Sequence, residues 1–143
     1  MIIARANLKS FGERTKKILV VDDESDIRDI LSDVLTSEGF EVNTAENGAA
    51  ALQILLKANY DLLITDVNMP QMDGIELLDR IFEKKMEVKT IIMSSLLSQI
   101  NMEYVKRRRI SGCISKPFQL DELIATVEYG LEVNDNKASI TQH

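Results

Sequence analysis

Acidic side chains stand directly after two apolar segments of this chain. Asp22 and Asp23 follow the segment Ile18–Val21, and Asp66 follows the segment Leu62–Thr65. Buried strands rarely finish on carboxylates without a reason, because a desolvated carboxylate needs a partner. Three carboxylates at the ends of two neighbouring parallel strands would form an acidic pocket at one edge of a sheet. Such a pocket suits Mg2+, which can steer a phosphoryl group onto one of the acids.

The elements that must position these acids alternate between short apolar segments and amphipathic ones. We expect strands at Lys17–Val21, Glu41–Ala45, Asp61–Thr65, Lys89–Met93 and Gly112–Ser115. We expect helices from a cap at Ser25 or Asp26 to Gly39, after Asn47-Gly48, after Asp73-Gly74, within Leu97–Arg108 and over about Leu120–Leu131. Nearly continuous apolar strands separated by helices predict a parallel sheet that is covered on both faces.

Functional residues of such a sheet lie at the carboxyl ends of its strands, in the crevice where the strand order reverses. Polar side chains occur at four of these ends: Asp22-Asp23, Asp66, Ser94-Ser95 and Lys116. The second strand ends only on Ala45-Glu46, as expected of an edge strand outside the site.

Length and composition predict one cytoplasmic domain. A chain of 143 residues with 45% hydrophobic content has enough core to fold alone. Its net charge of -6 argues against a basic nucleic-acid-binding face, and the single cysteine, Cys113, fits a reducing cytosol. No apolar run approaches the ~20 residues of a membrane span. We expect residues 1–15 to be a flexible extension, 16–133 the domain, and 134–143 a disordered tail.

Several separated motifs resemble the receiver domain of two-component response regulators. They are Val-Val-Asp22-Asp23-Glu24, Leu-Leu-Ile-Thr-Asp66-Val-Asn68-Met69-Pro70-Gln-Met-Asp73-Gly74, Ile-Ile-Met-Ser94-Ser95 and Ser-Lys116-Pro117-Phe118. The resemblance spans about Lys16 to Leu131, with the motifs in order and at family-like spacing. It implies a flavodoxin-like, doubly wound sheet of five parallel strands in the order 2-1-3-4-5, with five helices.

The resemblance also implies a role for each acid. Asp66 would accept the phosphoryl group. Asp23 and Asp66 would hold Mg2+, with Asp22 acting directly or through water and Asn68 adding its backbone carbonyl. Lys116 would pair with Asp66 at rest and with the phosphoryl group afterwards.

A hydroxyl and a proline complete the implied switch. Ser94 lies 22 residues before Lys116, a spacing that favours it over Ser95 as the switch hydroxyl. The bond from Lys116 to Pro117 is expected to be cis, as in the family.

The implied function is signalling rather than enzymatic turnover of a substrate. The donor would be a phosphohistidine on a sensor histidine kinase or a histidine phosphotransfer protein. The phosphorylated domain would control an output domain, a partner or a homodimer through the face of the fourth and fifth helices. It would catalyse only its own phosphorylation and dephosphorylation.

Three positions depart from the family pattern. Arg109-Ile110 replaces a usual pair of small residues, Cys113 stands where an aromatic switch residue is common, and Leu96 follows Ser94 by two residues. These changes put the usual aromatic route of output in doubt. The basic run Lys106–Arg109 is typical of a solvated helix end, and a docking patch is the alternative.

Two other functions compete with the receiver. A haloacid-dehalogenase-like phosphohydrolase also uses an Asp nucleophile, Mg2+, a hydroxyl and a lysine, but resembles Asp-x-Asp, whereas this chain has Asp66-Val67-Asn68. A pseudo-receiver that binds proteins without being phosphorylated normally lacks an acid or the lysine. Singly, the acids also fit a helix start or a turn.

Overall fold

A five-stranded parallel sheet forms the centre of the computed structural model, which describes residues 14–69 and 72–135. Its strands are β1 (Lys17–Val21), β2 (Glu41–Ala45), β3 (Leu62–Asp66), β4 (Lys89–Ser94) and β5 (Gly112–Ser115). The strand order is β2-β1-β3-β4-β5, so the predicted flavodoxin-like topology is confirmed. Asp66 and Ser94 end their strands, because β3 and β4 each extend one residue further than predicted.

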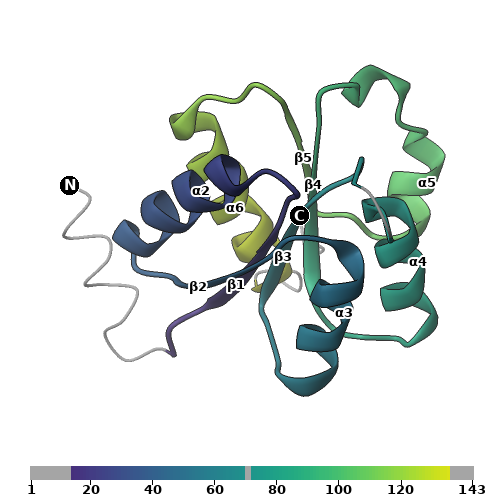
Figure 1. Ribbon diagram of the computed structural model, residues 1–143, viewed down its shortest axis with the longest axis horizontal. Coiled ribbons are helices and arrows are strands. Elements are labelled where there is room, and N and C mark those ends of the chain that lie inside the picture. The colour runs from purple at the N-terminus through teal and green to yellow at the C-terminus, as the bar shows by residue number, and fades with distance from the viewer. Residues whose placement is uncertain (1–13, 70–71, 136–143) are drawn as a thin grey trace, which may run out of the picture.

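Five α-helices cover the two faces of this sheet within the described residues. They are α2 (Ser25–Ser37), α3 (Gly48–Lys57), α4 (Gly74–Glu83), α5 (Met102–Arg107) and α6 (Leu120–Asp135), with a short 3-10 helix η1 (Leu97–Gln99) before α5. Helices α2 and α6 pack on one face and α3, α4 and α5 on the other (Figure 1). Alternate residues of each central strand therefore enter separate cores, which is why these strands are apolar throughout.

Local capping signals fix where several helices begin and end. Asn47 accepts a hydrogen bond from the amide of Ala50 and so caps α3, and Asp73 caps α4 in the same way. Gly39 has a φ of 99°, which explains the glycine after α2. The predicted cap at Ser25 or Asp26 is wrong. Both lie inside the helix, and the N-cap position is Glu24, whose side chain makes no capping bond.

The segment predicted as the fourth helix divides in two. The backbone forms η1, and α5 begins only after Asn101, whose side chain accepts hydrogen bonds from the amides of Glu103 and Tyr104. The cap therefore restarts the helix and shortens it. Helix α6 instead continues to Asp135, beyond the predicted end near Leu131.

Most of the predicted extension and tail lies outside the described residues, which exclude 1–13, 70–71 and 136–143. Arg14, near the end of that extension, forms an ion pair with Asp61 at 2.7 Å. No helix in 14–69 or 72–135 combines the length and apolarity needed to cross a membrane.

Candidate functional site

Three carboxylates meet at the carboxyl ends of β1 and β3. Asp22, Asp23 and Asp66 each offer an oxygen that lies within 4.8 Å of the others. Asp22 and Asp66 are buried, with exposed fractions of 0% and 6%, whereas Asp23 is exposed. The sheet brings them together because β1 and β3 are neighbours in register, with Val21 opposite Thr65. The cluster therefore has two carboxylates that are shielded from solvent and one, on Asp23, that is open to it.

Lys116 places a positive charge inside this cluster. Its Nζ donates to Asp22 Oδ2 at 2.7 Å and to Asp66 Oδ2 at 3.1 Å. A third carboxylate oxygen, from Glu24, lies 3.6 Å away and is largely exposed. Lys116 therefore bridges two acids, whereas the sequence predicted its pairing with Asp66 alone. Glu24 is a neighbour that the sequence did not assign to the site.

Backbone amides hold the remaining carboxylate oxygens in place. Asp22 Oδ1 accepts from the amide of Glu24 at 2.9 Å, and Asp66 Oδ1 accepts from the amide of Asn68 at 3.2 Å. Arg28 donates to the carbonyl of Asp22 at 2.7 Å. The two amide bonds orient the carboxylates of Asp22 and Asp66, and the bond from Arg28 holds the backbone of Asp22. The Asn68 amide lies beside Asp66, which places the backbone of Asn68 at the cluster.

Burial and charge act in opposite directions on the acidity of the site. Burial raises the pKa of Asp66 above its ordinary value, and hydrogen bonds from Asn68 and Lys116 only partly offset this. Burial alone would lower the pKa of Lys116, but the hydrogen bonds and charges of Asp22 and Asp66 raise it. The lysine is therefore firmly charged, while the resting pocket disfavours ionised Asp66. More positive charge in the pocket would favour the ionised, nucleophilic form.

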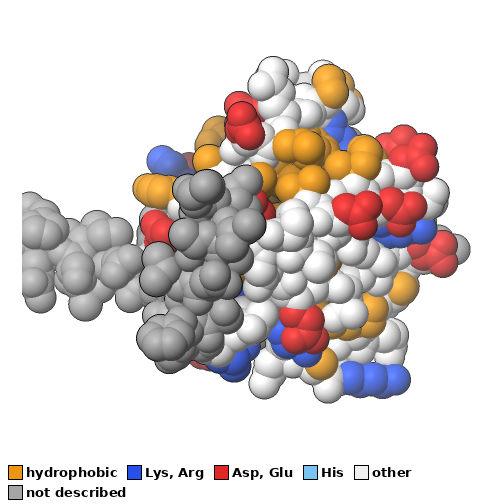
Figure 2. Space-filling view, turned by 90° about the vertical axis from the view of Figure 1, so that its left-hand side faces the viewer, with side chains coloured by type: hydrophobic (Ala, Val, Ile, Leu, Met, Phe, Trp, Pro, Cys, Tyr) orange, Lys and Arg blue, Asp and Glu red, His pale blue; other side chains and the backbone are white. Residues whose placement is uncertain are grey.

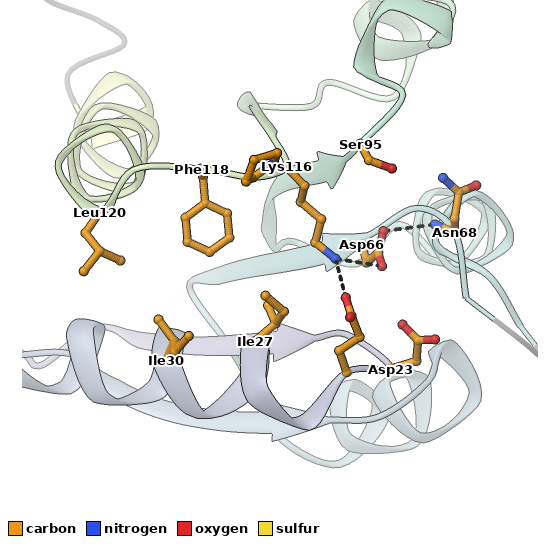
Figure 3. A pocket seen from close by; sticks show the side chains of 11 residues that line it. Asp23, Ile27, Ile30, Asp66, Asn68, Ser95, Lys116, Phe118 and Leu120 are labelled. Carbon is orange, nitrogen blue, oxygen red and sulfur yellow. Dashed lines mark hydrogen bonds and ion pairs between the residues drawn. The ribbon is translucent and has the colours of Figure 1, made fainter.

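The two serines at the end of β4 point to different environments. Ser94 is buried, and its Oγ accepts from the amide of Leu96 at 2.9 Å. Ser95 is exposed and lines the pocket beside Asp66 and Lys116 (Figure 3). The carbonyl of Ser94 also accepts from the amide of Lys116 at 2.9 Å. The bond from Lys116 to Pro117 is cis, as predicted.

Asp23 and Asp66 open into a pocket of about 810 Å3 with an apolar side that the sequence did not predict. Lys116 separates the acids from Ile27, Ile30, Phe118 and Leu120, which form this apolar wall with Pro117 (Figure 3). Ile30 lies on the apolar face of α2, yet 43% of it is exposed. On the face drawn in Figure 2, hydrophobic side chains gather in the upper part of the molecule. The spacing of Ile27 and Ile30 marks an apolar face of the helix. The same spacing fits a face that packs into the core, so it does not by itself indicate a pocket.

Known proteins are similar to this chain in fold and in sequence. A family model described as the response regulator receiver domain matches residues 18–128. The chain belongs to the response regulator receiver domain family. The resemblance noted in the sequence is therefore confirmed, and so is its class of function, a signalling module of two-component systems.

Relatives of this receiver domain differ in length. The chain is 35% identical over 121 residues to sporulation initiation phosphotransferase F of Bacillus subtilis, covering 85% of this chain and 98% of that protein. It is 32% identical over 124 residues to the regulatory protein AtoC of Escherichia coli, but that match covers only 27% of AtoC. The receiver thus spans nearly all of one relative and about a quarter of another.

Solved structures agree with this receiver fold. The response regulator protein TrrA of Thermotoga maritima, in complex with Mg(2+)-BeF, is 38% identical with a TM-score of 0.74. That match covers 82% of this chain and 100% of the other. A receiver domain protein of Methanospirillum hungatei is 26% identical with a TM-score of 0.80, covering 87% of this chain and 99% of that one.

Proposed function

We propose that this receiver domain takes a phosphoryl group from a phosphohistidine onto Asp66 and changes conformation as a result. The observation that carries the proposal is the buried carboxylate of Asp66, with Lys116 at 3.1 Å and two further acids around it. Asp66 needs no general base, because a carboxylate is a nucleophile once ionised. The charged groups around Asp66 provide the electrostatic environment for the transfer, and the open side of the pocket gives the donor access to the carboxylate.

In the transfer step, a carboxylate oxygen of Asp66 attacks the phosphorus atom of the donor. An O–P bond forms while the N–P bond to the imidazole breaks, and its electron pair stays on the ring nitrogen. Asp66 becomes an acyl phosphate. Lys116 then pairs with a phosphoryl oxygen in place of Asp66, and its ammonium group limits the charge that builds up. Hydrolysis of the acyl phosphate restores the Asp66 carboxylate and releases inorganic phosphate. The only reactions of the domain are therefore its own phosphorylation and dephosphorylation.

The acid cluster fits Mg2+. Its donors are carboxylate oxygens, the ligand type that this ion prefers, and three of them lie within 4.8 Å of one another. Asp22, Asp23 and Asp66 would hold the ion together with the backbone carbonyl of Asn68. When bound, Mg2+ offsets the negative charge of the phosphoryl oxygens. Lys116 alone leaves the cluster with excess negative charge.

The donor is proposed to be a sensor histidine kinase or a histidine phosphotransfer protein. Support comes from the apolar wall beside the acids. A small anionic donor would make no contact with such a surface, whereas a protein donor could pack against it. The wall consists of Ile27, Ile30, Pro117, Phe118 and Leu120. Output would pass to an attached domain, a partner or a second copy through the face of α5 and α6. These events belong in the cytoplasm. Residues 16–133 would form the receiver, between an extension and a tail.

The competing functions make different demands on these residues. A haloacid-dehalogenase-like hydrolase needs a second acid two residues after its nucleophile, and Asn68 occupies that position. A pseudo-receiver has no need of a lysine aimed at the acids, yet Lys116 contacts two of them. Neither alternative is favoured by a feature of its own.

Phosphoryl uptake from acetyl phosphate tests the proposal. Intact mass should increase by one phosphate in the presence of Mg2+ and not in EDTA, because the acids repel the donor without the ion. Asp66→Asn should remove the increase, whereas Asp26→Asn, an exposed acid that does not line the pocket, should keep it. A phosphate retained on Asp66→Asn would place the reaction on another acid. Equal uptake with and without EDTA would refute the metal requirement.

A further inference from the structure

Two glycines begin the helices next to the site, and each holds the same short segment. The amide of Gly48, at the start of α3, donates to the carbonyl of Met72 at 3.0 Å. The amide of Gly74, at the start of α4, donates to the carbonyl of Val67 at 3.2 Å. We call Met72–Gly74 the loop return. It is tied to α3 on one side and to the residue after Asp66 on the other.

Neither glycine leaves room for a side chain. A Cβ at Gly48 would lie 2.3 Å from the carbonyl oxygen of Met72, and one at Gly74 would lie 2.2 Å from the carbonyl oxygen of Asp66. Both obstacles are backbone atoms, which cannot rotate away as a side chain would. Neither glycine has a positive φ. The requirement is therefore space for a close approach, and not conformational freedom.

The start of α3 is the firmer partner in this contact. Gly48 is buried, Asn47 caps the helix through the amide of Ala50 at 2.8 Å, and Ala51 and Leu52 lie in the core. A side chain at Gly48 would therefore displace Met72 more readily than α3. Movement of Met72 passes directly to Asp73, which caps α4, and to Gly74, which closes on Asp66 and Val67.

We propose that Gly48 is a positioning residue for phosphoryl transfer: by admitting the Met72 carbonyl, it fixes the loop return and so the backbone of Asp66 and Val67. The inference rests on the proposed function, because it concerns how the same site is held. Gly48 belongs to a different βα unit from Asp66 and lines no part of the pocket. The neighbouring unit thereby sets the geometry of the acid cluster. Figure 1 shows α3 and α4 lying side by side, as this link requires.

The Mg2+ dependence of acetyl phosphate uptake tests this role in Gly48→Ala. The variant should need about tenfold more Mg2+ for half-maximal rate, the lower end of the loss caused by misplaced support of a metal ligand. Two controls separate positioning from stability. Asn47→Ala removes the α3 cap without obstructing Met72, and Gly130→Ala adds a Cβ in α6 where the nearest atoms are 3.6 Å away. Both controls should keep the parent's Mg2+ requirement.

Amide hydrogen exchange on the metal-free protein gives a second readout that needs no phosphorylation. In Gly48→Ala, the amides of Asn68 and Gly74 should exchange faster than in the parent, and neither control should change them. In the parent, Mg2+ should slow exchange at Gly48 more than at Ala50, because coupling between two sites is reciprocal. That measurement holds even if Gly48→Ala does not fold.

The outcomes separate the two proposals. A parent that takes up no phosphate refutes the proposed function, while the exchange data still decide the role of Gly48. Unchanged exchange and an unchanged Mg2+ requirement in Gly48→Ala would show that Gly48 positions nothing. The same result follows if Asn47→Ala alters both quantities as strongly as Gly48→Ala.

Discussion

At the scale of single residues, the site is a balance between burial and charge around Asp66. Its carboxylate is almost fully buried and shares Lys116 with Asp22. Burial nevertheless dominates and raises the pKa of Asp66. The resting pocket therefore disfavours the negative charge of Asp66, and added positive charge, such as that of a bound cation, would relieve this.

This balance predicts how stability changes with pH in the metal-free protein. A group whose pKa is higher in the folded state stabilises the fold at low pH, and that contribution is lost as pH rises through the folded pKa. Asp66→Asn should therefore be more stable than the parent at neutral pH, by on the order of 1 kcal/mol. Urea unfolding in EDTA measures this difference, which should shrink as the solution is made acidic. A difference that grows on acidification would contradict the raised pKa.

Ser94 is the residue that we propose as the switch hydroxyl. Its hydroxyl accepts from the amide of Leu96, so a hydroxyl that turned toward a phosphoryl group would release that amide. Ser94→Ala should still be phosphorylated but should lose about 1 kcal/mol of stability with this partly buried hydrogen bond. Beryllofluoride should change amide exchange over residues 95–101 in the parent and not in Ser94→Ala. Cys113→Ala serves as the control and should respond as the parent does.

At the scale of elements, α5 is fastened to α4 at its C-terminal end. Asp79 of α4 accepts from the hydroxyl of Tyr104 at 2.7 Å and from Nε of Arg108 at 3.0 Å. The guanidinium of Arg108 also lies 4.6 Å from the ring centre of Phe82. In the basic run Lys106–Arg109, Arg108 therefore makes contacts within the domain, whereas the sequence predicted a solvated helix end.

Removal of one hydroxyl tests this connection between α4 and α5. Burial, followed by the hydrogen bond to Asp79, raises the pKa of Tyr104, so the hydroxyl remains a donor in neutral solution. Tyr104→Phe should lower the free energy of unfolding by about 1 kcal/mol, because Asp79 loses a partner while the ring stays in place. Tyr129→Phe is the control, since that side chain is 66% exposed. Equal losses in both variants would mean that the Tyr104 hydroxyl contributes nothing specific.

Two helices are followed by residues whose replacement by glycine should stabilise the domain. Lys85 after α4 and Arg109 after α5 have φ values of 56° and 57°. Non-glycine residues pay about 1–2 kcal/mol in this left-handed conformation. Lys85→Gly and Arg109→Gly should each stabilise the domain by roughly 1 kcal/mol, as thermal unfolding would reveal. Lys84→Gly, at a φ of -85°, should destabilise it instead, and a gain there would point to a general effect of glycine.

At the scale of the whole molecule, we expect the acidic pocket to couple the proposed cation binding to folding. The cluster draws on β1 and β3, and Lys116 reaches it from the end of β5, so its assembly requires the folded sheet. Mg2+ should therefore stabilise the folded state by about 1.4 kcal/mol at ten times its dissociation constant. Thermal unfolding in MgCl2 and in NaCl of equal ionic strength measures this. Asp66→Asn should show a much smaller increase, and an equal increase would place the ion elsewhere.

Local signals in the sequence determined most of the secondary structure. The bounds of β1, β2 and β5 follow from apolar runs with polar ends, and Asn47, Asp73 and Gly39 act where short-range chemistry places them. Ordered motifs likewise indicated the receiver family and the strand ends at which the acids lie. Such features depend on neighbours within a few residues, and a sequence displays those neighbours directly.

Only the tertiary structure decided how residues distant in the chain share space. Lys116 divides its hydrogen bonds between Asp22 and Asp66, and Ile30 lines the pocket, because these positions depend on how β5 and α2 pack. The division of the fourth helix and the contact of Gly48 with Met72 have the same origin. Periodicity shows that a helix face is apolar, but whether that face meets a core, a pocket or a backbone oxygen depends on three-dimensional packing.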